Sequence, residues 1–173
     1  MSAPSMGRPP LDDAPRIGLG IDVHRLERGR RCVLGGLELP GELGPSGHSD
    51  GDAILHAVCD ACLGAAGLDD LGTLFSDKDP RNLGRDSREF CVETMRRLGD
   101  AKLRVISLDV VVECERPKIA PHRAALRASL AELFAIDSSR VNVKGKTAEG
   151  LDAIGRGEAL RVTAVALLLP AAR

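Results

Sequence analysis

Two stretches of the sequence carry side chains that can bind a metal ion. In RIGLGIDVHRL (residues 16–26), Asp22 and His24 are two residues apart, so they point to the same side of a predicted strand. His56 lies in GHSDGDAILHAVCDACLGAAG (residues 47–67), which is typical of a short buried helix. If the helix packs across the strand, the three side chains can share one ion. Two imidazoles and one carboxylate suit zinc and leave a tetrahedral position open for a substrate oxygen or water.

These residue types also occur often at strand ends and on helices that bind no metal, so their spacing alone leaves both interpretations open. In the predicted helix, Asp52, His56 and Asp60 are four residues apart and form a polar stripe. Ser49 or Asp50 is placed to cap its N-terminus. The apolar residues at helical spacing predict a buried face, formed by Ile54, Leu55, Val58, Ala61, Cys62 and Ala65.

A second polar group follows the predicted strand VNVKGK. Lys144 and Lys146, with Thr147 and a glycine-rich turn that contains Arg156, can hold a phosphate through cations, a hydroxyl and backbone amides. Glu149 can bind a hard cation such as Mg²⁺ beside that phosphate. Solvated lysines at strand ends and exposed loop glutamates are equally ordinary, and the turn matches no phosphate loop of defined spacing.

The elements that must position these residues predict one α+β domain. The chain has 173 residues, 43% of them hydrophobic, which suffices for one core but not for two ordinary domains. Residues 1–14 are rich in Pro, Ser and Ala and are expected to form a flexible tail, with a single domain over residues 15–173. We expect a mixed four-stranded sheet with helices packed on one face.

The strands are predicted from alternation. Ile17, Leu19, Ile21 and Val23 alternate along the first strand and predict that it has one buried, apolar face. The segment CVLGGLEL is expected to pair with this strand, and LRVISLDVVVEC, VNVKGK and ALRVTAVALLLP supply the others. The last strand is apolar on both faces.

Bulk composition excludes several classes of function. Lys and Arg number 24 against 25 Asp and Glu, with a pI of about 6.4, so we expect neither a nucleic-acid partner nor a membrane surface. The sequence has no apolar run of membrane-spanning length and no secretory start, so a cytoplasmic location is expected. The five cysteines lie mostly in apolar segments, which favours reduced, buried thiols over disulfides, including for the pair Cys59 and Cys62.

Five motifs occur together over about residues 16–170. They are G-x-D-V-H-R-L at 20–26, H-S-D-G-D-A at 48–53, L-F-x-D-x-D-P at 74–80, P-K-x-x-P-H at 117–122, and V-N-V-K-x-K-T-x-E with G-R-G-E within 141–158. In this order and spacing the chain resembles the 2-C-methyl-D-erythritol 2,4-cyclodiphosphate synthase family of the non-mevalonate isoprenoid pathway.

The resemblance implies a reaction: 4-diphosphocytidyl-2-C-methyl-D-erythritol 2-phosphate is cyclised to the 2,4-cyclodiphosphate with release of CMP. It also implies a zinc ion on Asp22, His24 and His56, a second cation, Mg²⁺ or Mn²⁺, on Glu149, and a homotrimer with each active site between neighbouring subunits. Two rival functions stay open at this point, a zinc phosphohydrolase that activates water and a non-catalytic module that binds nucleotides or metal.

The resemblance further implies roles for individual residues. His48 and Thr147 are expected to be catalytic, and Asp52 and Asp60 are hypothesised to orient the ligating imidazole with their carboxylates. Substrate contacts are expected from Ser49, Asp70, Gly72, Phe75, Asp77, Lys118, Ile119, Ala120, Lys146, Thr147 and Arg156.

Overall fold

The computed structural model describes residues 14–47, 49–76, 79 and 82–171. The predicted tail therefore lies almost wholly outside the described residues. The described chain folds around one large cluster of buried apolar side chains.

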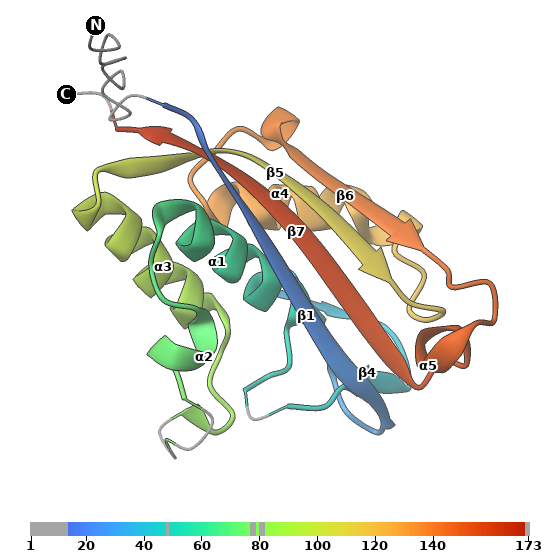
Figure 1. Ribbon diagram of the computed structural model, residues 1–173. Coiled ribbons are helices and arrows are strands. Elements are labelled where there is room, and N and C mark those ends of the chain that lie inside the picture. Colours follow the sequence, from blue (N-terminus) through green and yellow to red (C-terminus); the bar gives the residue numbers. More distant parts are fainter. Residues whose placement is uncertain (1–13, 48, 77–78, 80–81, 172–173) are drawn as a thin grey trace, which may run out of the picture.

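A mixed five-stranded sheet forms one layer of the molecule (Figure 1). Strands β5 and β6 are parallel and every other neighbouring pair is antiparallel. The neighbour of β1 at the sheet edge is the short, unpredicted strand β4 and not the segment CVLGGLEL. The order across the sheet is β4 (Leu43–Pro45), β1 (Arg16–Arg28), β7 (Ala159–Pro170), β5 (Leu103–Glu113) and β6 (Val141–Lys146).

Helices cover one face of this sheet, as expected, and α1 lies across β1 and β7 at its centre (Figure 1). The helix α3 packs beside α1, and α4 packs against β6. The helices are α1 (Ala53–Ala66), α2 (Leu71–Leu74), α3 (Arg88–Asp100), α4 (Arg123–Leu133) and α5 (Asp152–Gly155), with short 3-10 turns η3 (Ala120–His122) and η4 (Ser138–Arg140).

The prediction for the faces of β1 is wrong, because its glycines and not its apolar residues face the core. A Cβ on Gly18 would lie 1.9 Å from the Ala61 carbonyl oxygen, and one on Gly20 would lie 2.0 Å from that of Ala57. The glycines therefore let the backbone of α1 approach the strand closely. The apolar alternate residues lie on the outer face and are exposed in this chain: Ile17, Leu19, Ile21 and Val23.

The pairing predicted for CVLGGLEL is also wrong. This segment closes on itself as a hairpin of β2 (Cys32–Leu34) and β3 (Leu37–Leu39), in a separate two-stranded sheet. The turn residues Gly35 and Gly36 have φ angles of 60° and 75°. Consecutive positive φ angles are those of a tight two-residue hairpin turn, which glycine adopts without strain.

The five cysteines are all buried and free, as expected. Within the described residues, no helix is both long enough and apolar enough to cross a bilayer.

Candidate metal centre and substrate pocket

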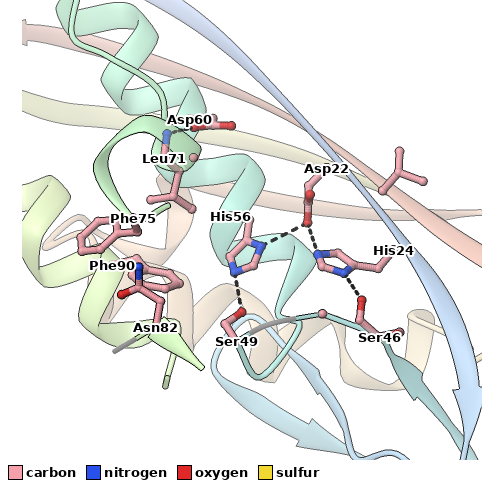
Figure 2. A pocket seen from close by; sticks show the side chains of 13 residues that line it. Asp22, His24, Ser46, Ser49, His56, Asp60, Leu71, Phe75, Asn82 and Phe90 are labelled. Carbon is pink, nitrogen blue, oxygen red and sulfur yellow. Dashed lines mark hydrogen bonds and ion pairs between the residues drawn. The ribbon is translucent and has the colours of Figure 1, made fainter. Parts of the chain in front are cut away.

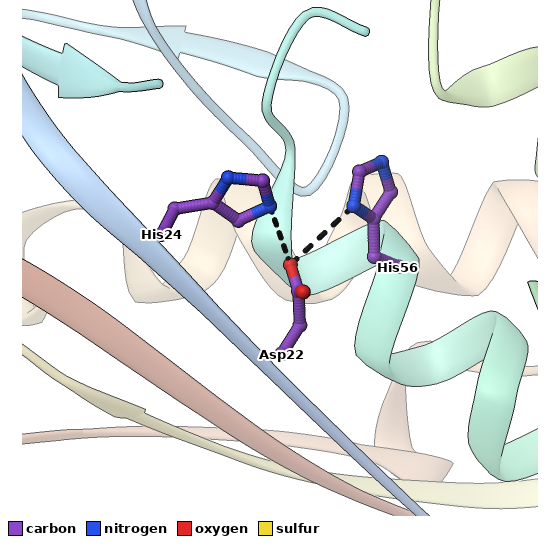
Figure 3. A group of neighbouring side chains, drawn as sticks. All are labelled: Asp22, His24 and His56. Atoms are coloured by element: carbon purple, nitrogen blue, oxygen red, sulfur yellow. Dashed lines mark ion pairs between the residues drawn. The ribbon is translucent and has the colours of Figure 1, made fainter. Parts of the chain in front are cut away.

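Asp22, His24 and His56 converge on one point between β1 and α1, as their spacing predicts (Figure 3). The Asp22 Oδ2 atom lies 2.7 Å from His24 Nε2 and 3.4 Å from His56 Nδ1. One ligand atom from each residue lies within 4.8 Å of the others, so the three side chains could hold a single metal ion between them.

The close contact between α1 and β1 places these side chains. Gly20 precedes Asp22 on the same side of the strand, and the Gly20 backbone lies against Ala57, the residue after His56. A larger residue in place of this glycine would push the helix outward and His56 with it. The arrangement of the three side chains therefore depends on the close contact of Gly20, two residues before Asp22, with α1.

Two ligand atoms have no hydrogen-bond partner among the described residues, although both are buried: Asp22 Oδ2 and His24 Nε2. Their mutual contact is short, yet its angles are not those of a hydrogen bond. Buried polar atoms without partners are rare in proteins and call for an explanation. The donor set and these two atoms together fit a divalent metal ion such as zinc.

The same contacts shift the pKa values of Asp22 and His24. Burial alone raises the pKa of Asp22, but the contacts with His24 and His56 outweigh it and hold that pKa well below its usual range. Burial lowers the pKa of His24, while Asp22 raises it, and the net change is upward. The site therefore attracts positive charge at the point where the three side chains meet.

The remaining ring nitrogens set the orientation of each imidazole. His24 Nδ1 lies 2.6 Å from the Ser46 carbonyl oxygen, which can only accept, so this nitrogen carries the proton and Nε2 is free to bind metal. His56 Nε2 lies 3.2 Å from Ser49 Oγ and 3.0 Å from Ser87 Oγ, and its Nδ1 faces Asp22.

A cavity of about 390 Å³ opens in front of the three side chains (Figure 2). Of the predicted substrate-binding residues, Ser49, Gly72 and Phe75 line it. Phe75 packs on Phe90, with ring centroids 4.5 Å apart, and Phe90 packs in turn on His56. The cavity thus has a polar, metal-binding side and an apolar wall.

Asp70 lies next to this cavity without lining it. Its side chain accepts a hydrogen bond from the Thr73 backbone N–H and caps the short helix α2, which brings Gly72 to the cavity. His48 and Asp77 lie outside the described residues.

Among the described residues, the Asp52 carboxylate makes no hydrogen bond to an imidazole. Its carboxylate is buried and accepts hydrogen bonds from the backbone N–H groups of Gly35, Gly36 and Leu55. It is thus the N-cap of α1, in place of the expected Ser49 or Asp50, and it also fastens the β2–β3 turn to the helix.

Asp60 lines the cavity, but its carboxylate accepts a hydrogen bond from the Leu71 backbone N–H at 2.7 Å. Burial raises the pKa of Asp60, and the bond from Leu71 partly opposes that rise. Its hydrogen bond holds α2 against α1, so it shapes the cavity and makes no direct bond to His56.

The second predicted group lies elsewhere on the chain. Strands β7 and β5 separate β6 from β1, and Val23, Arg161, Glu113 and Lys146 occupy one row across them. At about 4.8 Å between neighbouring strands, this row spans about 14 Å. None of the second group lines the cavity: Lys118, Ile119, Ala120, Lys146, Thr147, Glu149 and Arg156.

Within this second group, Thr147 Oγ1 donates a hydrogen bond to Glu149 Oε1 at 2.7 Å, and Arg156 pairs with Glu158. Ile119 is buried beneath Gly145, where a Cβ would lie 2.8 Å from the Cβ of Ile119. The side chain of Ile119 therefore belongs to the core, and only its backbone is available to a ligand.

Sequence reasoning missed Ser87, which contacts His56 from the N-terminus of α3, and the hydrogen bond from Ser87 to Asp50 in the loop before α1. Ser87 is separated from His56 by 31 residues, so spacing could not reveal the contact. The only sequence signal is a serine just before the residues that form α3, and a serine at that place is ordinarily a helix cap.

Comparison with known proteins places this chain in a family. The YgbB family model matches residues 15–169. The chain belongs to this family. It is 51% identical over 154 residues to the 2-C-methyl-D-erythritol 2,4-cyclodiphosphate synthase of Desulfosudis oleivorans. The matched residues cover 89% of this chain and 92% of that relative. The resemblance that the motifs indicate is thereby confirmed, and the chain is a cyclising lyase of isoprenoid biosynthesis.

Solved structures agree with this assignment. A 2C-methyl-D-erythritol-2,4-cyclodiphosphate synthase in a form with CDP bound matches with a TM-score of 0.82 and 44% identity, over 88% of this chain and 99% of that one. The bifunctional IspDF from Campylobacter jejuni matches with a TM-score of 0.88 and 32% identity, over 91% of this chain. The chain spans 43% of that longer protein.

Proposed function

We propose that this protein cyclises 4-diphosphocytidyl-2-C-methyl-D-erythritol 2-phosphate to 2-C-methyl-D-erythritol 2,4-cyclodiphosphate and releases CMP. The observation that carries the proposal is the convergence of Asp22, His24 and His56 at the edge of a cavity, in a chain of this family. A relative with CDP bound supports a cytidine nucleotide as part of the ligand.

The chemistry is an intramolecular phosphoryl transfer. An oxygen of the 2-phosphate forms a bond to the β-phosphorus, and the bond from that phosphorus to the oxygen of CMP breaks. Nucleophile, reacting group and leaving group are all anionic, so the reaction requires positive charge and alignment more than a protein nucleophile.

Asp22, His24 and His56 would hold zinc, and Glu149 would hold the second cation, Mg²⁺ or Mn²⁺. When bound, the two cations supply Lewis acidity and neutralise charge at the diphosphate. Ser49 lines the cavity and is placed to donate a hydrogen bond to a phosphate oxygen. His48 and Thr147 are proposed to stabilise the transferring phosphoryl group.

The apolar wall has its own part in the reaction. Leu71, Phe75 and Phe90 line one side of the cavity. Their apolar side chains offer water no hydrogen-bond partner there and so disfavour it. Water would compete with the 2-phosphate for the β-phosphorus and give an open-chain product. Exclusion of water therefore favours cyclisation over hydrolysis.

A complete active site is proposed to need two chains. The metal-binding residues and the second group, led by Lys118, Lys146 and Glu149, are separated by about three strand spacings in one chain. In a homotrimer the second group of one subunit would complete the cavity of its neighbour. The exposed apolar outer face of β1 supports such an assembly, because monomers rarely expose large apolar patches.

Metal removal tests the function. Dialysis against a strong chelator is expected to abolish CMP release from the cytidyl substrate, and addition of zinc with Mg²⁺ is expected to restore it. Asp22→Asn should lower kcat/KM by about 100-fold or more, because a metal ligand is lost. Asp137→Asn is the matched control, since this exposed aspartate caps η4 outside the cavity.

The outcome separates the proposal from its rivals. CMP release that survives complete metal removal would contradict it. A fully metallated protein that releases no CMP would instead favour a non-catalytic nucleotide-binding module.

A further inference from the structure

Ser87 links His56 at the metal centre to the carboxylate of Asp50, which does not line the cavity. Its Oγ lies 3.0 Å from His56 Nε2 and 2.5 Å from Asp50 Oδ1. The Ser87 backbone N–H also donates to Asp50 Oδ2, at 3.1 Å. The serine is thus held at two points by one carboxylate and presents its hydroxyl to the imidazole.

The direction of each hydrogen bond follows from the chemistry of the groups. A carboxylate only accepts, so the Ser87 hydroxyl donates its single proton to Asp50. The lone pairs of that hydroxyl are then left for His56, and Nε2 must be the nitrogen that carries the proton. A neutral imidazole protonated at Nε2 has its free lone pair on Nδ1, the atom that faces Asp22.

Burial distinguishes Ser87 from Ser49, the other hydroxyl near His56 Nε2. Ser87 is fully buried and does not line the cavity. Ser49 does line the cavity, and its Oγ also accepts a hydrogen bond from the Gly51 backbone N–H. Ser87 can therefore act on the reaction only through His56, whereas Ser49 can reach a substrate.

Asp50 is itself fixed in place. Its backbone N–H donates to the Arg85 carbonyl oxygen at 3.1 Å, and its Oδ1 accepts a bond from the Asp52 N–H at 3.2 Å. The loop before α1 and the N-terminus of α3 are tied together at this carboxylate. The chain from Asp50 through Ser87 to His56 thus links two helices at the metal centre.

We propose that Asp50 and Ser87 are positioning residues that hold His56 with Nδ1 directed at the metal. This inference rests on the proposed function, because it takes Asp22, His24 and His56 as the metal ligands. Such outer hydrogen bonds fix the tautomer and the ring orientation of a ligating histidine, and their loss typically weakens metal binding by about 10- to 100-fold.

The test measures metal binding directly. Zinc affinity is determined by competition with a chromophoric chelator for the wild type, Ser87→Ala, Asp50→Asn and the double variant. Each single variant is expected to bind zinc about 10- to 100-fold more weakly. Both residues act through the same series of hydrogen bonds. The double variant should therefore bind zinc only slightly more weakly than the single variant with the lower zinc affinity.

Thr94→Val is the matched control. Thr94 is fully buried on α3, like Ser87 at the start of that helix, but its hydroxyl has no hydrogen-bond partner among the described residues. Removal of this hydroxyl should leave zinc affinity unchanged. The visible spectrum of the Co²⁺-substituted protein should change in Ser87→Ala and Asp50→Asn and stay the same in Thr94→Val.

Each outcome decides between named alternatives. If the wild type binds zinc and both single variants bind it equally well with an unchanged Co²⁺ spectrum, the inference is wrong and the proposed function stands. If the wild type binds no zinc, both are wrong. If Ser87→Ala fails to fold by circular dichroism, Asp50→Asn, which keeps the serine hydroxyl, gives the answer.

Discussion

At the scale of single residues, the acids around the centre differ in what they bind. Asp22 has a buried oxygen with no hydrogen-bond partner among the described residues, whereas Asp52 accepts bonds from three backbone N–H groups. The first arrangement leaves an oxygen free for a cation, and the second satisfies the carboxylate entirely with the backbone. Burial and polarity alone do not distinguish a carboxylate that can bind a cation from one that caps a helix, but their hydrogen-bond partners do.

Asp52→Asn tests the capping role. One amide N–H group would then face a backbone N–H that the carboxylate oxygen now satisfies, so we expect the free energy of unfolding to fall by about 1–3 kcal/mol. Chemical denaturation measures that loss, and zinc content should stay at the wild-type value. A variant that loses zinc while its stability is unchanged would restore the hypothesis that Asp52 orients an imidazole.

Glu93 gives a pH dependence at the same scale. Its bonds with Arg96 and Arg97 lower its pKa from 4.5 to about 2, against a smaller effect of burial. Because the folded pKa is depressed, the stabilisation is present above pH 4.5 and is lost as the pH falls toward 2.

The two ion pairs of Glu93 are expected to stabilise the fold by only about 0.2–1 kcal/mol at neutral pH, because their charges are partly exposed. Glu93→Gln should therefore be less stable than the wild type at pH 7 and equally stable near pH 2, by urea denaturation. Glu132→Gln, an exposed position on α4, is the control. A difference that persists unchanged at pH 2 would refute the assignment to the ion pairs.

At the scale of elements, the contact between β1 and α1 decides both the core and the metal centre. Gly18 and Gly20 on the strand lie against the carbonyl groups of Ala61 and Ala57 on the helix. A small-residue surface on the strand meets alanines on the helix, and the short distance brings His56 over Asp22 and His24.

Gly20→Ala tests this dependence. Its Cβ would lie 2.0 Å from the Ala57 backbone oxygen, and no side-chain rotation relieves that clash. We expect the free energy of unfolding to fall by about 3 kcal/mol or more, as in the largest overpacking effects. Zinc binding should weaken in whatever folded protein remains. Gly64→Ala is the control, since nothing lies within 4 Å of its Cβ and alanine favours the helix by about 1 kcal/mol. Equal stability of the two variants would contradict the account.

Sequence patterns predicted the strands β1, β5, β6 and β7, the helix α1 and the convergence of Asp22, His24 and His56, because periodicity and residue type are local. They failed on which face of β1 is buried, since Ile17 to Val23 alternate as a core face would, and the proposed partner surface would account for their exposure. The hairpin at Gly35–Gly36 was visible in principle, because two glycines between short apolar runs favour a tight turn. The Ser87 contact was not, as it depends on how α3 packs on α1.

At the scale of the whole molecule, the outer face of β1 carries a row of exposed aliphatic side chains. Ile17 is 73% exposed, Leu19 59%, Ile21 54% and Val23 57%, and Val165 lies opposite Leu19 on the neighbouring strand. Exposed aliphatic side chains in one row of a sheet favour burial between copies of the chain.

Ile21→Asp should break the proposed trimer. A charge in a buried apolar interface is costly, so sedimentation is expected to give a monomer mass with the circular dichroism of a folded chain. CMP release should fall with it, because each site is proposed to need two subunits. Val92→Asp, at an exposed position on α3, should retain the wild-type mass and activity. A trimeric Ile21→Asp protein would contradict the assignment of this face.

The most direct test of the central claim is phosphorus NMR of the reaction products. The zinc-loaded protein is incubated with 4-diphosphocytidyl-2-C-methyl-D-erythritol 2-phosphate and Mg²⁺, with and without chelator. The account predicts metal-dependent appearance of the cyclic diphosphate together with CMP, since the cavity is proposed to align the 2-phosphate and to exclude water. CMP accompanied by an open-chain phosphate, with no cyclic product, would contradict it and identify a hydrolase.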